Sequence, residues 1–311
     1  EVGMEVLRET NFDFLGEKKT GKVRDIYIQP DRLILVTTDR HSSFDRIIAH
    51  IPEKGAVLNL ISEFWFGVTK NIVPNHLIEV PDPNVVIAKK AKPFLVEVVV
   101  RGYLTGVTDT SIWTSYQKGK RDFGGITLPD GLKKNTPLPR AIITPTTKAG
   151  HDENLDLGDI VPRGLATEAE WAEMQRTALE LFALGQKHAA SKGFILVDTK
   201  YEFGLHEGKV ILIDEVHTPD NSRYWLQDSY AERLSKGEEP MAFDKEFLRI
   251  WFKQNCDPYK DAVLPEAPED MVLELSRRYI DIYEKLSGKK FEKHSGDMAT
   301  RIEKNLAQYK A

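Results

Sequence analysis

The sequence predicts an α+β fold, in which strands and helices are segregated along the chain. Strand-like segments come first, the middle is mixed, and the C-terminal tail is helical. A regular alternation of strands and helices, which a parallel α/β sheet would require, does not appear in this order. With 311 residues, 41% of them hydrophobic, the chain is long enough for two cores. We expect two domains, residues 1–112 and 113–311, the second ending in a helical segment that begins near residue 240.

The N-terminal part reads as two strand pairs around a helix. Residues 23–38 contain VRDIYI and LILVTT, separated by QPDR, which predicts a hairpin. Residues 56–70 have the apolar spacing of a helix. Residues 85–100 contain VVIAKK and FLVEVVV, which we expect to form a second strand pair.

The second half begins with a long loop and ends in helices. Residues 119–159 are rich in Gly, Pro, Thr and Asp, and a loop of this length inside a compact protein is usually functional or disordered. Thr167 followed by Glu170 forms a capping box, which predicts a helix that runs to Gly193. In the segments 268–288 and 295–309 apolar residues recur with a period of 3.6 residues, which predicts C-terminal helices.

Composition excludes several classes of protein. The net charge of -5 and the pI of about 6.0 argue against general binding of nucleic acid, which needs a basic excess. Cys256 is the only cysteine, so we expect no disulfide framework, no cysteine-based zinc site and a reducing, cytoplasmic compartment. The longest apolar runs are far below the roughly 20 residues that span a bilayer, and the first residues lack the apolar core of a signal peptide. HExxH and GxSxG motifs are absent from the sequence.

The segment 193–216, GFILVDTKYEFGLHEGKVILIDEV, predicts a hairpin that carries unusually many charges. Asp198, Lys200 and Glu202 share one strand face, because side chains alternate with period two. If GLHEGK is the turn, Glu202 lies opposite Asp214, and two opposed carboxylates repel unless a cation lies between them. Oxygen ligands of this kind suit Mg²⁺. A solvated outer face with surface ion pairs explains the same pattern, and spacing alone does not decide between the two.

Three other stretches carry polar and basic residues that suit a bound ligand. The turn GEKKTGKVRDIY carries Lys22 and Arg24 and either covers the phosphates of a nucleotide or forms a basic surface hairpin. TTDRHSSFDR, residues 37–46, ends a strand in polar groups that either hold a small polar ligand or form a turn. Arg101 follows a buried strand, where its guanidinium either receives a carboxylate or phosphate or joins a structural ion pair.

Six motifs in one order resemble the SAICAR synthetases, the phosphoribosylaminoimidazole-succinocarboxamide synthases of de novo purine biosynthesis. They are GKVRDIY, TTDRHSSFDRII, VEVVVRGYLTG, TPTTKAGHDEN, DTKYEFG and DEVHTPDNSRYW, and FDKEFLRIWF matches as well. The resemblance extends from about residue 12 to at least residue 252. It is greater to the single-function enzymes of about 300 residues, which carry VRGYLTG and TPTTK, than to the shorter bacterial form.

The resemblance implies a fold and a reaction. The fold is an N-terminal antiparallel β domain, similar to the small lobe of kinases, followed by an ATP-grasp-like α+β domain with C-terminal helices. The reaction joins L-aspartate to the carboxylate of carboxyaminoimidazole ribonucleotide (CAIR) and cleaves ATP to ADP and phosphate through an acyl phosphate. ATP and Mg²⁺ are implied, as are small-molecule substrates without nucleic acid or membrane, and a homo-oligomer is compatible with the family.

The resemblance also implies roles for individual residues. Lys200 and Asp198 would be catalytic, and Glu202 and Asp214 would hold Mg²⁺. ATP would be bound by these two carboxylates and by Lys22, Arg24, Glu97, Val99 and Lys148, with Glu97 and Val99 on an edge that faces adenine. The substrates would be bound by Asp39, Ser42, Ser43, Arg101, Asp152, Lys200, Arg223, Lys245 and Arg249, with Glu153 closing over the cleft.

The sequence departs from the family pattern at three positions. Val107 stands where many relatives place a serine that contacts the ribonucleotide, and Thr105, Thr108 or a backbone N–H are alternatives for this contact. His41 and His217 stand where relatives often carry apolar or small residues, either as titratable groups or without consequence.

Two other classes of function remain open at this point. A small-molecule kinase on the same scaffold would release ADP with an acceptor alcohol and without aspartate. A nucleotide-binding protein without catalysis would not need the metal-binding carboxylates.

Overall fold

The computed structural model describes residues 5–148 and 150–311, which form two compact α+β units. Unit 1 comprises the described residues up to Gly67 together with 76–90 and 247–311, and unit 2 comprises 68–75 and 91–246. The boundary expected near residue 112 therefore falls inside unit 2, and the C-terminal helices belong to unit 1. Among the described residues, no helix is both long and apolar enough to cross a bilayer.

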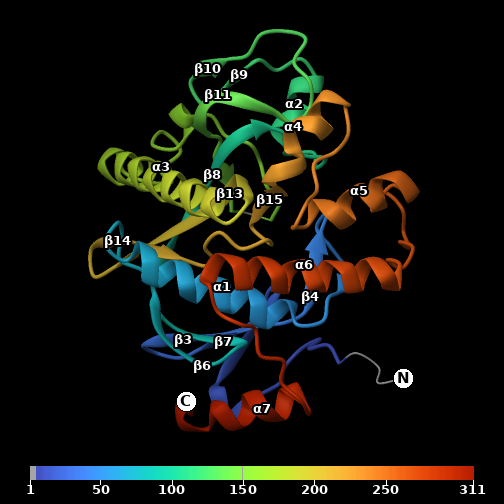
Figure 1. The fold of residues 1–311 in the computed structure, drawn as a ribbon. Coiled ribbons are helices and arrows are strands. Elements are labelled where there is room, and N and C mark those ends of the chain that lie inside the picture. The colour runs from blue at the N-terminus through green and yellow to red at the C-terminus, as the bar shows by residue number, and fades with distance from the viewer. Residues whose placement is uncertain (1–4, 149) are drawn as a thin grey trace. The chain divides into compact units, whose positions relative to one another are not determined.

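Unit 1 is built on a five-stranded antiparallel sheet in the order β1-β2-β3-β7-β6 (Figure 1). The hairpin predicted at residues 23–38 is confirmed, because β2 and β3 pair from Arg24–Thr37 to Ile28–Leu33. The strands are β1 (Glu17–Thr20), β2 (Arg24–Ile28), β3 (Arg32–Thr37), β6 (Leu77–Asp82) and β7 (Val85–Lys89). A separate hairpin joins β4 (Arg40–Ser43) to β5 (Arg46–His50).

The helices of unit 1 include the predicted C-terminal pair. Helix α7 lies beside β6 (Figure 1). Its residues Met298 and Ile302, together with Leu306 directly after the helix, complete the same core as Tyr27 and Ile34. The C-terminal segment therefore belongs to the core of the unit. The helical elements are η1 (Asp13–Leu15), α1 (Lys54–Thr69), α5 (Glu246–Asn255), α6 (Glu269–Ser287), α7 (Met298–Asn305) and η3 (Ala307–Tyr309).

The strand pair expected within residues 85–100 is wrong, because the two segments lie in different sheets. Strand β7 is hydrogen-bonded to β3 on one side and to β6 on the other, so neither of its edges is free. The following strand β8 (Lys92–Leu104) instead lies inside the sheet of unit 2.

Unit 2 contains a six-stranded antiparallel sheet in the order β11-β8-β13-β14, with β12 beside β8 and β15 beside β13. Helix α3 (Glu168–Ser191) packs against β13 and β8 (Figure 1). The predicted capping box at its start is confirmed, since Glu170 N donates to Thr167 Oγ1 and Thr167 N donates to Glu170 Oε1. The other elements are α2 (Ile112–Gln117), β9 (Asp122–Phe123), β10 (Ile126–Thr127), β11 (Thr136–Ile143), β12 (Thr146–Thr147), η2 (Leu157–Asp159), β13 (Phe194–His206), β14 (Lys209–Ile213), β15 (Ser222–Leu226) and α4 (Gln227–Ser235).

The long loop expected at residues 119–159 contains strand β11. Pro137 and Pro139 lie within this strand. They argue against a strand in the sequence, because proline lacks the N–H that a central strand needs. An edge strand tolerates proline, and β11 is the edge strand next to β8, with its register interrupted between Pro137 and Ile142.

The hairpin of β13 and β14 forms as predicted, but its expected register is wrong by one residue. The ladder runs from His206–Lys209 to Glu202–Ile213, so the turn is Glu207-Gly208 alone. Both turn residues have positive φ, 51° and 74°, as two-residue hairpin turns require. Asp214 therefore lies one position beyond β14, with φ 69°, and does not pair with Glu202.

Candidate active site

Charged side chains from three adjacent strands line one face of the unit 2 sheet. Residues directly opposite each other in an antiparallel ladder project from the same face. On β13 the face carries Asp198, Lys200 and Glu202, whose partners on β8 are Arg101, Val99 and Glu97, and Asp198 also pairs with Arg223 on β15. The face therefore holds two neighbouring charged clusters.

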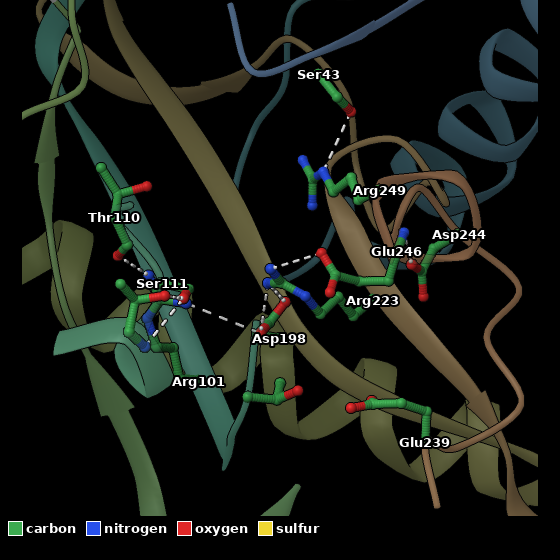
Figure 2. A network of polar contacts seen from close by, with 12 residues as sticks. Ser43, Arg101, Thr110, Ser111, Asp198, Arg223, Glu239, Asp244, Glu246 and Arg249 are labelled. Carbon is green, nitrogen blue, oxygen red and sulfur yellow. Dashed lines mark hydrogen bonds and ion pairs between the residues drawn. The ribbon is translucent and has the colours of Figure 1, made fainter. Parts of the chain in front are cut away.

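The first cluster consists of two arginines that share one carboxylate (Figure 2). Arg223 Nη1 donates to both oxygens of Asp198 at 3.1 and 3.0 Å, and Arg101 Nη1 lies 3.9 Å from Asp198 Oδ2. Arg223 Nη2 also donates to Glu246 Oε1 at 3.2 Å. Burial lowers the pKa of Arg101 to about 10, although Asp198 opposes the shift. Burial also lowers the pKa of Arg223, but Asp198 and Glu246 raise it more, so both guanidiniums remain charged at neutral pH.

Beside this cluster, the backbone at Gly106 comes close to Arg223. A Cβ at Gly106 would lie 2.3 Å from Ser111 Cβ and 2.9 Å from Arg223 Nη2, and its φ of 111° also favours glycine. After residues 107–110 the chain returns to Gly106 at Ser111. We therefore propose Ser111 for the contact that the family pattern gives to the serine expected at Val107. Ser111 is the N-cap of α2, and a serine directly before IWTSYQ was the sequence signal that marks this position.

The second cluster places two ammonium groups around two opposed carboxylates. Glu97 and Glu202 are direct cross-strand partners, an arrangement that is repulsive without a cation between them. Lys200 Nζ lies 3.1 Å from Glu97 Oε1 and 3.4 Å from Glu202 Oε1, and Lys148 Nζ lies 2.6 Å from Glu202 Oε2. Thr146 Oγ1 donates to the other oxygen of Glu97 at 3.0 Å.

The charges in this cluster fix the protonation of its lysine. Burial lowers the pKa of Lys200, but Glu202 and Glu97 raise it more, and the net shift is upward. Burial also raises the pKa of Glu97, against the effect of Lys200. One third of the Lys200 side chain is exposed, so a ligand can reach it. Lys200 is therefore a cation in this state and is suited to stabilising negative charge, not to removing a proton.

The carboxylates fit Mg²⁺ that is bound mainly through a ligand. Among the residues that the structure describes, no group of three or more His, Cys, Asp or Glu side chains is placed to hold a metal. Mg²⁺ is commonly held by one or two carboxylates plus phosphate oxygens and water. Glu202, whose side chain is 8% exposed and lies between Lys148 and Lys200, supplies a carboxylate for such a site. Asp214 directly follows the strand that pairs with β13 at Glu202.

The edge expected to face adenine at Glu97 and Val99 stays a prediction, and β8 is an interior strand at these residues. Val99 O accepts a hydrogen bond from Thr144 N at 2.9 Å, and Glu97 pairs with Thr146 on β12. On its other side, β8 pairs with β13 at the same residues. The backbone at these positions has no free edge, and the side chain of Glu97 instead joins the lysine cluster.

Several predicted site residues lie in unit 1. Asp39 is 1% exposed, and its oxygens accept backbone N–H groups of Leu7 and Gly55, both at 2.8 Å. Its carboxylate is thus committed to the backbone, and burial raises its pKa to about 6 although these N–H groups lower it. Arg249 Nε donates to Ser43 Oγ at 3.2 Å, which brings two predicted substrate residues together (Figure 2).

The remaining predicted residues have different surroundings. Lys22 Nζ lies 2.7 Å from Asp45 Oδ1 on the exposed glycine-containing turn. Lys245 forms a buried ion pair with Asp220 at 3.2 Å, which favours a structural role for this lysine. Three others are placed by their elements alone: Arg24 opens β2, Ser42 is buried in β4, and Asp152 lies in the loop after β12.

The family model for SAICAR synthetase matches residues 17–265. This chain belongs to the SAICAR synthetase family. The phosphoribosylaminoimidazole-succinocarboxamide synthase of Legionella pneumophila (strain Paris) is 54% identical over 307 residues, which cover 97% of this chain and 98% of the relative. The chloroplastic enzyme of that name from Arabidopsis thaliana is 56% identical over 274 residues, covering 88% and 67%.

Solved structures agree with this membership. The structure described as SAICAR-synthase from Saccharomyces cerevisiae complexed with SAICAR superposes with a TM-score of 0.78 at 35% identity, covering 92% of this chain and 100% of that chain. The predicted α+β fold of a SAICAR synthetase is thereby confirmed.

Proposed function

We propose that this protein is a ligase of purine biosynthesis that forms SAICAR from CAIR, L-aspartate and ATP. Family membership over nearly the whole chain supports this function. The strongest structural support is the charged face of the unit 2 sheet. There Arg101 and Arg223 surround Asp198, and Lys148 and Lys200 lie beside Glu202 and Glu97. A net acidic protein that binds three anionic substrates needs its cations concentrated in this way.

The chemistry explains why such a site needs cations and no nucleophilic side chain. The CAIR carboxylate is a poor electrophile, because displacement at its carbon would expel oxide. Attack of a carboxylate oxygen on the γ-phosphorus of ATP breaks the bond to ADP and forms an acyl phosphate. The aspartate amine then attacks the acyl carbon, phosphate leaves, and the nitrogen loses a proton. Phosphoryl transfer depends mainly on positioning and charge neutralisation.

In this proposal the arginine cluster binds the phosphate of the ribonucleotide. Arg101 and Arg223 are both charged at neutral pH, and Gly106 and Ser111 lie beside Arg223. Arginine guanidiniums are well suited to phosphate, and a serine hydroxyl adds a neutral donor. Asp198 holds the two guanidiniums apart and in place, so we assign it the role of orienting them.

The lysine cluster is the proposed site of phosphoryl transfer. Lys200 supplies positive charge to the transferring group and to the CAIR carboxylate, while Lys148 and the turn with Lys22 and Arg24 contact the phosphates of ATP. Glu202 and Asp214 would hold Mg²⁺, which when bound neutralises charge on the phosphate oxygens. Without ligand, Lys148 and Lys200 neutralise Glu202 and Glu97 instead.

Residues of unit 1 are proposed to bind carboxylates of the substrates. Ser43 and Arg249 present a hydroxyl and a guanidinium side by side, a donor pair that suits a carboxylate. Ser42 precedes Ser43 on the same strand.

Product formation tests the proposal and separates it from the two other classes of function. The purified protein is incubated with Mg-ATP and CAIR, with and without L-aspartate, and ADP and SAICAR are quantified by chromatography. We expect equal amounts of ADP and SAICAR, both dependent on aspartate. ADP release that needs no aspartate would favour a kinase, and ATP binding without turnover would favour a non-catalytic protein.

A matched pair of variants tests the lysine. Lys200→Ala is expected to abolish aspartate-dependent ADP release while the fold survives, whereas Lys209→Ala, an exposed lysine on β14, leaves the rate unchanged. Normal turnover by Lys200→Ala would remove Lys200 from the mechanism.

We also propose a reducing compartment for this protein. A single cysteine favours a reducing compartment such as the cytoplasm. The names of two plant relatives contain the word chloroplastic, so membership in the family is compatible with more than one compartment.

A further inference from the structure

The segment 214–221 joins β14 to β15 and is hydrogen-bonded to the backbone of β13 at Lys200. We call it the 214–221 loop. It begins at Asp214, the proposed metal ligand, and two of its residues, Asp214 and His217, have positive φ values of 69° and 50°. Backbone in this region is strained for residues other than glycine and persists only where other contacts hold it.

Asn221 supplies most of these contacts with one side chain. Asn221 Nδ2 donates to Lys200 O at 3.2 Å and to Glu215 O at 3.1 Å. Asn221 Oδ1 accepts from Thr218 N at 3.0 Å, and this N–H can only donate, so the orientation of the amide is fixed. The backbone adds a further bond, from Lys200 N to Asn221 O at 3.1 Å. Both backbone polar groups of Lys200 are therefore bonded to Asn221.

His217 fastens the same loop to the next residue of β13. Its Nε2 is hydrogen-bonded to Tyr201 Oη, and its carbonyl accepts from Tyr224 Oη. All three side chains are fully buried. A Cβ at Gly185 of α3 would lie 2.6 Å from His217 Cε1, which explains a glycine inside a helix where it is otherwise unfavourable.

We propose that Asn221 is a positioning residue for the reaction, supported by the Tyr201–His217 pair. It holds the backbone of Lys200 and the loop that carries Asp214 in one fixed relation. This inference rests on the proposed function, since it assigns a consequence to the positions of Lys200 and Asp214. Catalytic groups have to be held by such supporting bonds, because displacement of about 1 Å costs up to about 10²-fold in rate.

The variant Asn221→Asp isolates this role. Aspartate has the same size and keeps the acceptor for Thr218 N, but it turns a carboxylate oxygen toward the carbonyls of Lys200 and Glu215. Asn59→Asp is the matched control, because Asn59 Nδ2 also donates to two carbonyls, Pro83 O at 2.9 Å and Val85 O at 3.2 Å. Asn59 lies in α1 and makes none of the loop contacts.

Two readouts distinguish positioning from simple destabilisation, both taken well below the thermal midpoints of all proteins. The first is kcat for SAICAR formation, which we expect to fall at least about tenfold in Asn221→Asp and to stay within about twofold in Asn59→Asp. The second is ADP affinity by calorimetry with Mg²⁺ and with EDTA. Asn221→Asp should lose affinity about tenfold with Mg²⁺ and keep it in EDTA.

The outcomes separate this inference from the proposed function. If wild type forms no SAICAR, the proposed function has failed, and the calorimetric readout alone still decides whether Asn221 supports the metal-dependent site. A folded Asn221→Asp protein with wild-type kcat and wild-type Mg-ADP affinity would overturn the inference, even if its thermal midpoint fell as much as that of Asn59→Asp.

Tyr201→Phe decides the matter if Asn221→Asp does not fold. It removes only the hydroxyl that meets His217, and Tyr116→Phe is its control, since Tyr116 Oη donates to Pro129 O at 2.6 Å elsewhere in unit 2. We expect a fall in kcat of about fivefold or more in Tyr201→Phe, and little change in Tyr116→Phe. Equal kcat in the two variants would overturn the inference.

Discussion

Replacing Asp198 with asparagine tests whether the two arginines depend on one shared carboxylate. The side chains of Asp198, Arg101 and Arg223 are only 5%, 6% and 11% exposed. Asparagine keeps the shape of the side chain and removes its charge. Two guanidiniums then face each other across an uncharged group, and only Arg223 keeps a second carboxylate, Glu246. Burial already lowers the pKa of Arg101 to about 10, and the loss of Asp198 lowers this pKa further.

The size of the effect follows from the burial of the cluster. Removing one partner of a buried ion pair costs about 3–5 kcal/mol, because a buried charge is left uncompensated. At a urea dependence of about 2 kcal/mol/M, a loss of about 3 kcal/mol moves the unfolding midpoint down by about 1.5 M. An anion that replaces the carboxylate should restore stability, by about 2.7 kcal/mol when phosphate is present at about 100 times its Kd.

Urea denaturation of Asp198→Asn, with and without inorganic phosphate, measures both effects. Asp130→Asn is the control, because Asp130 forms an exposed ion pair with Arg121 at 2.7 Å and its side chain is 90% exposed. Such surface pairs contribute little, so its midpoint should barely move. A loss in Asp198→Asn no larger than in the control, or a loss that phosphate does not reduce, would refute the account of a cluster built to receive an anion.

Three further predictions concern other parts of the molecule. Ser111→Ala should raise the KM for CAIR about tenfold, because a hydrogen bond to a charged group is lost, while Val107→Ser should leave this KM unchanged. Steady-state kinetics at saturating ATP and aspartate measure both values. A change in KM for Val107→Ser and none for Ser111→Ala would assign the contact to position 107. Gly185→Ala should lower the free energy of unfolding by about 1–3 kcal/mol, although alanine has the better helix propensity, because the added Cβ would lie 2.6 Å from His217 Cε1. A raised thermal midpoint would contradict this prediction and show that the imidazole moves aside. Burial raises the pKa of Asp39 from 3.8 to about 6, so the folded state binds this proton more tightly than the unfolded state does. Stability should therefore fall as pH rises from about 4 to about 6, by up to about 1.4 kcal/mol per unit, and urea titrations of Asp39→Asn should show a flatter dependence than wild type.

Local signals in the sequence predicted the elements that depend on local contacts. The capping box of Thr167 and Glu170 fixes the start of α3, and the alternation in residues 24–37 fixes the first hairpin. The alternation on β13 also predicted that Asp198, Lys200 and Glu202 share a face, because it depends on the period of a strand and on no distant partner.

Features that depend on pairing between strands could not be predicted. The turn at Glu207-Gly208 uses a non-glycine residue with positive φ, so the sequence suggested a longer turn, and this displaced Asp214 by one position. The true partner of Glu202 is Glu97, more than a hundred residues away in the chain, and only the sheet order reveals it.

Transfer of oxygen from CAIR to phosphate tests the central claim most directly, namely that the charged face activates a carboxylate by phosphorylating it. CAIR labelled with ¹⁸O in its carboxylate is converted with unlabelled ATP and L-aspartate, and the released phosphate is examined by mass spectrometry. The account predicts that each phosphate carries one oxygen from the labelled carboxylate, because that oxygen leaves with phosphorus when the amine attacks. Phosphate without the label, formed together with SAICAR, would contradict it.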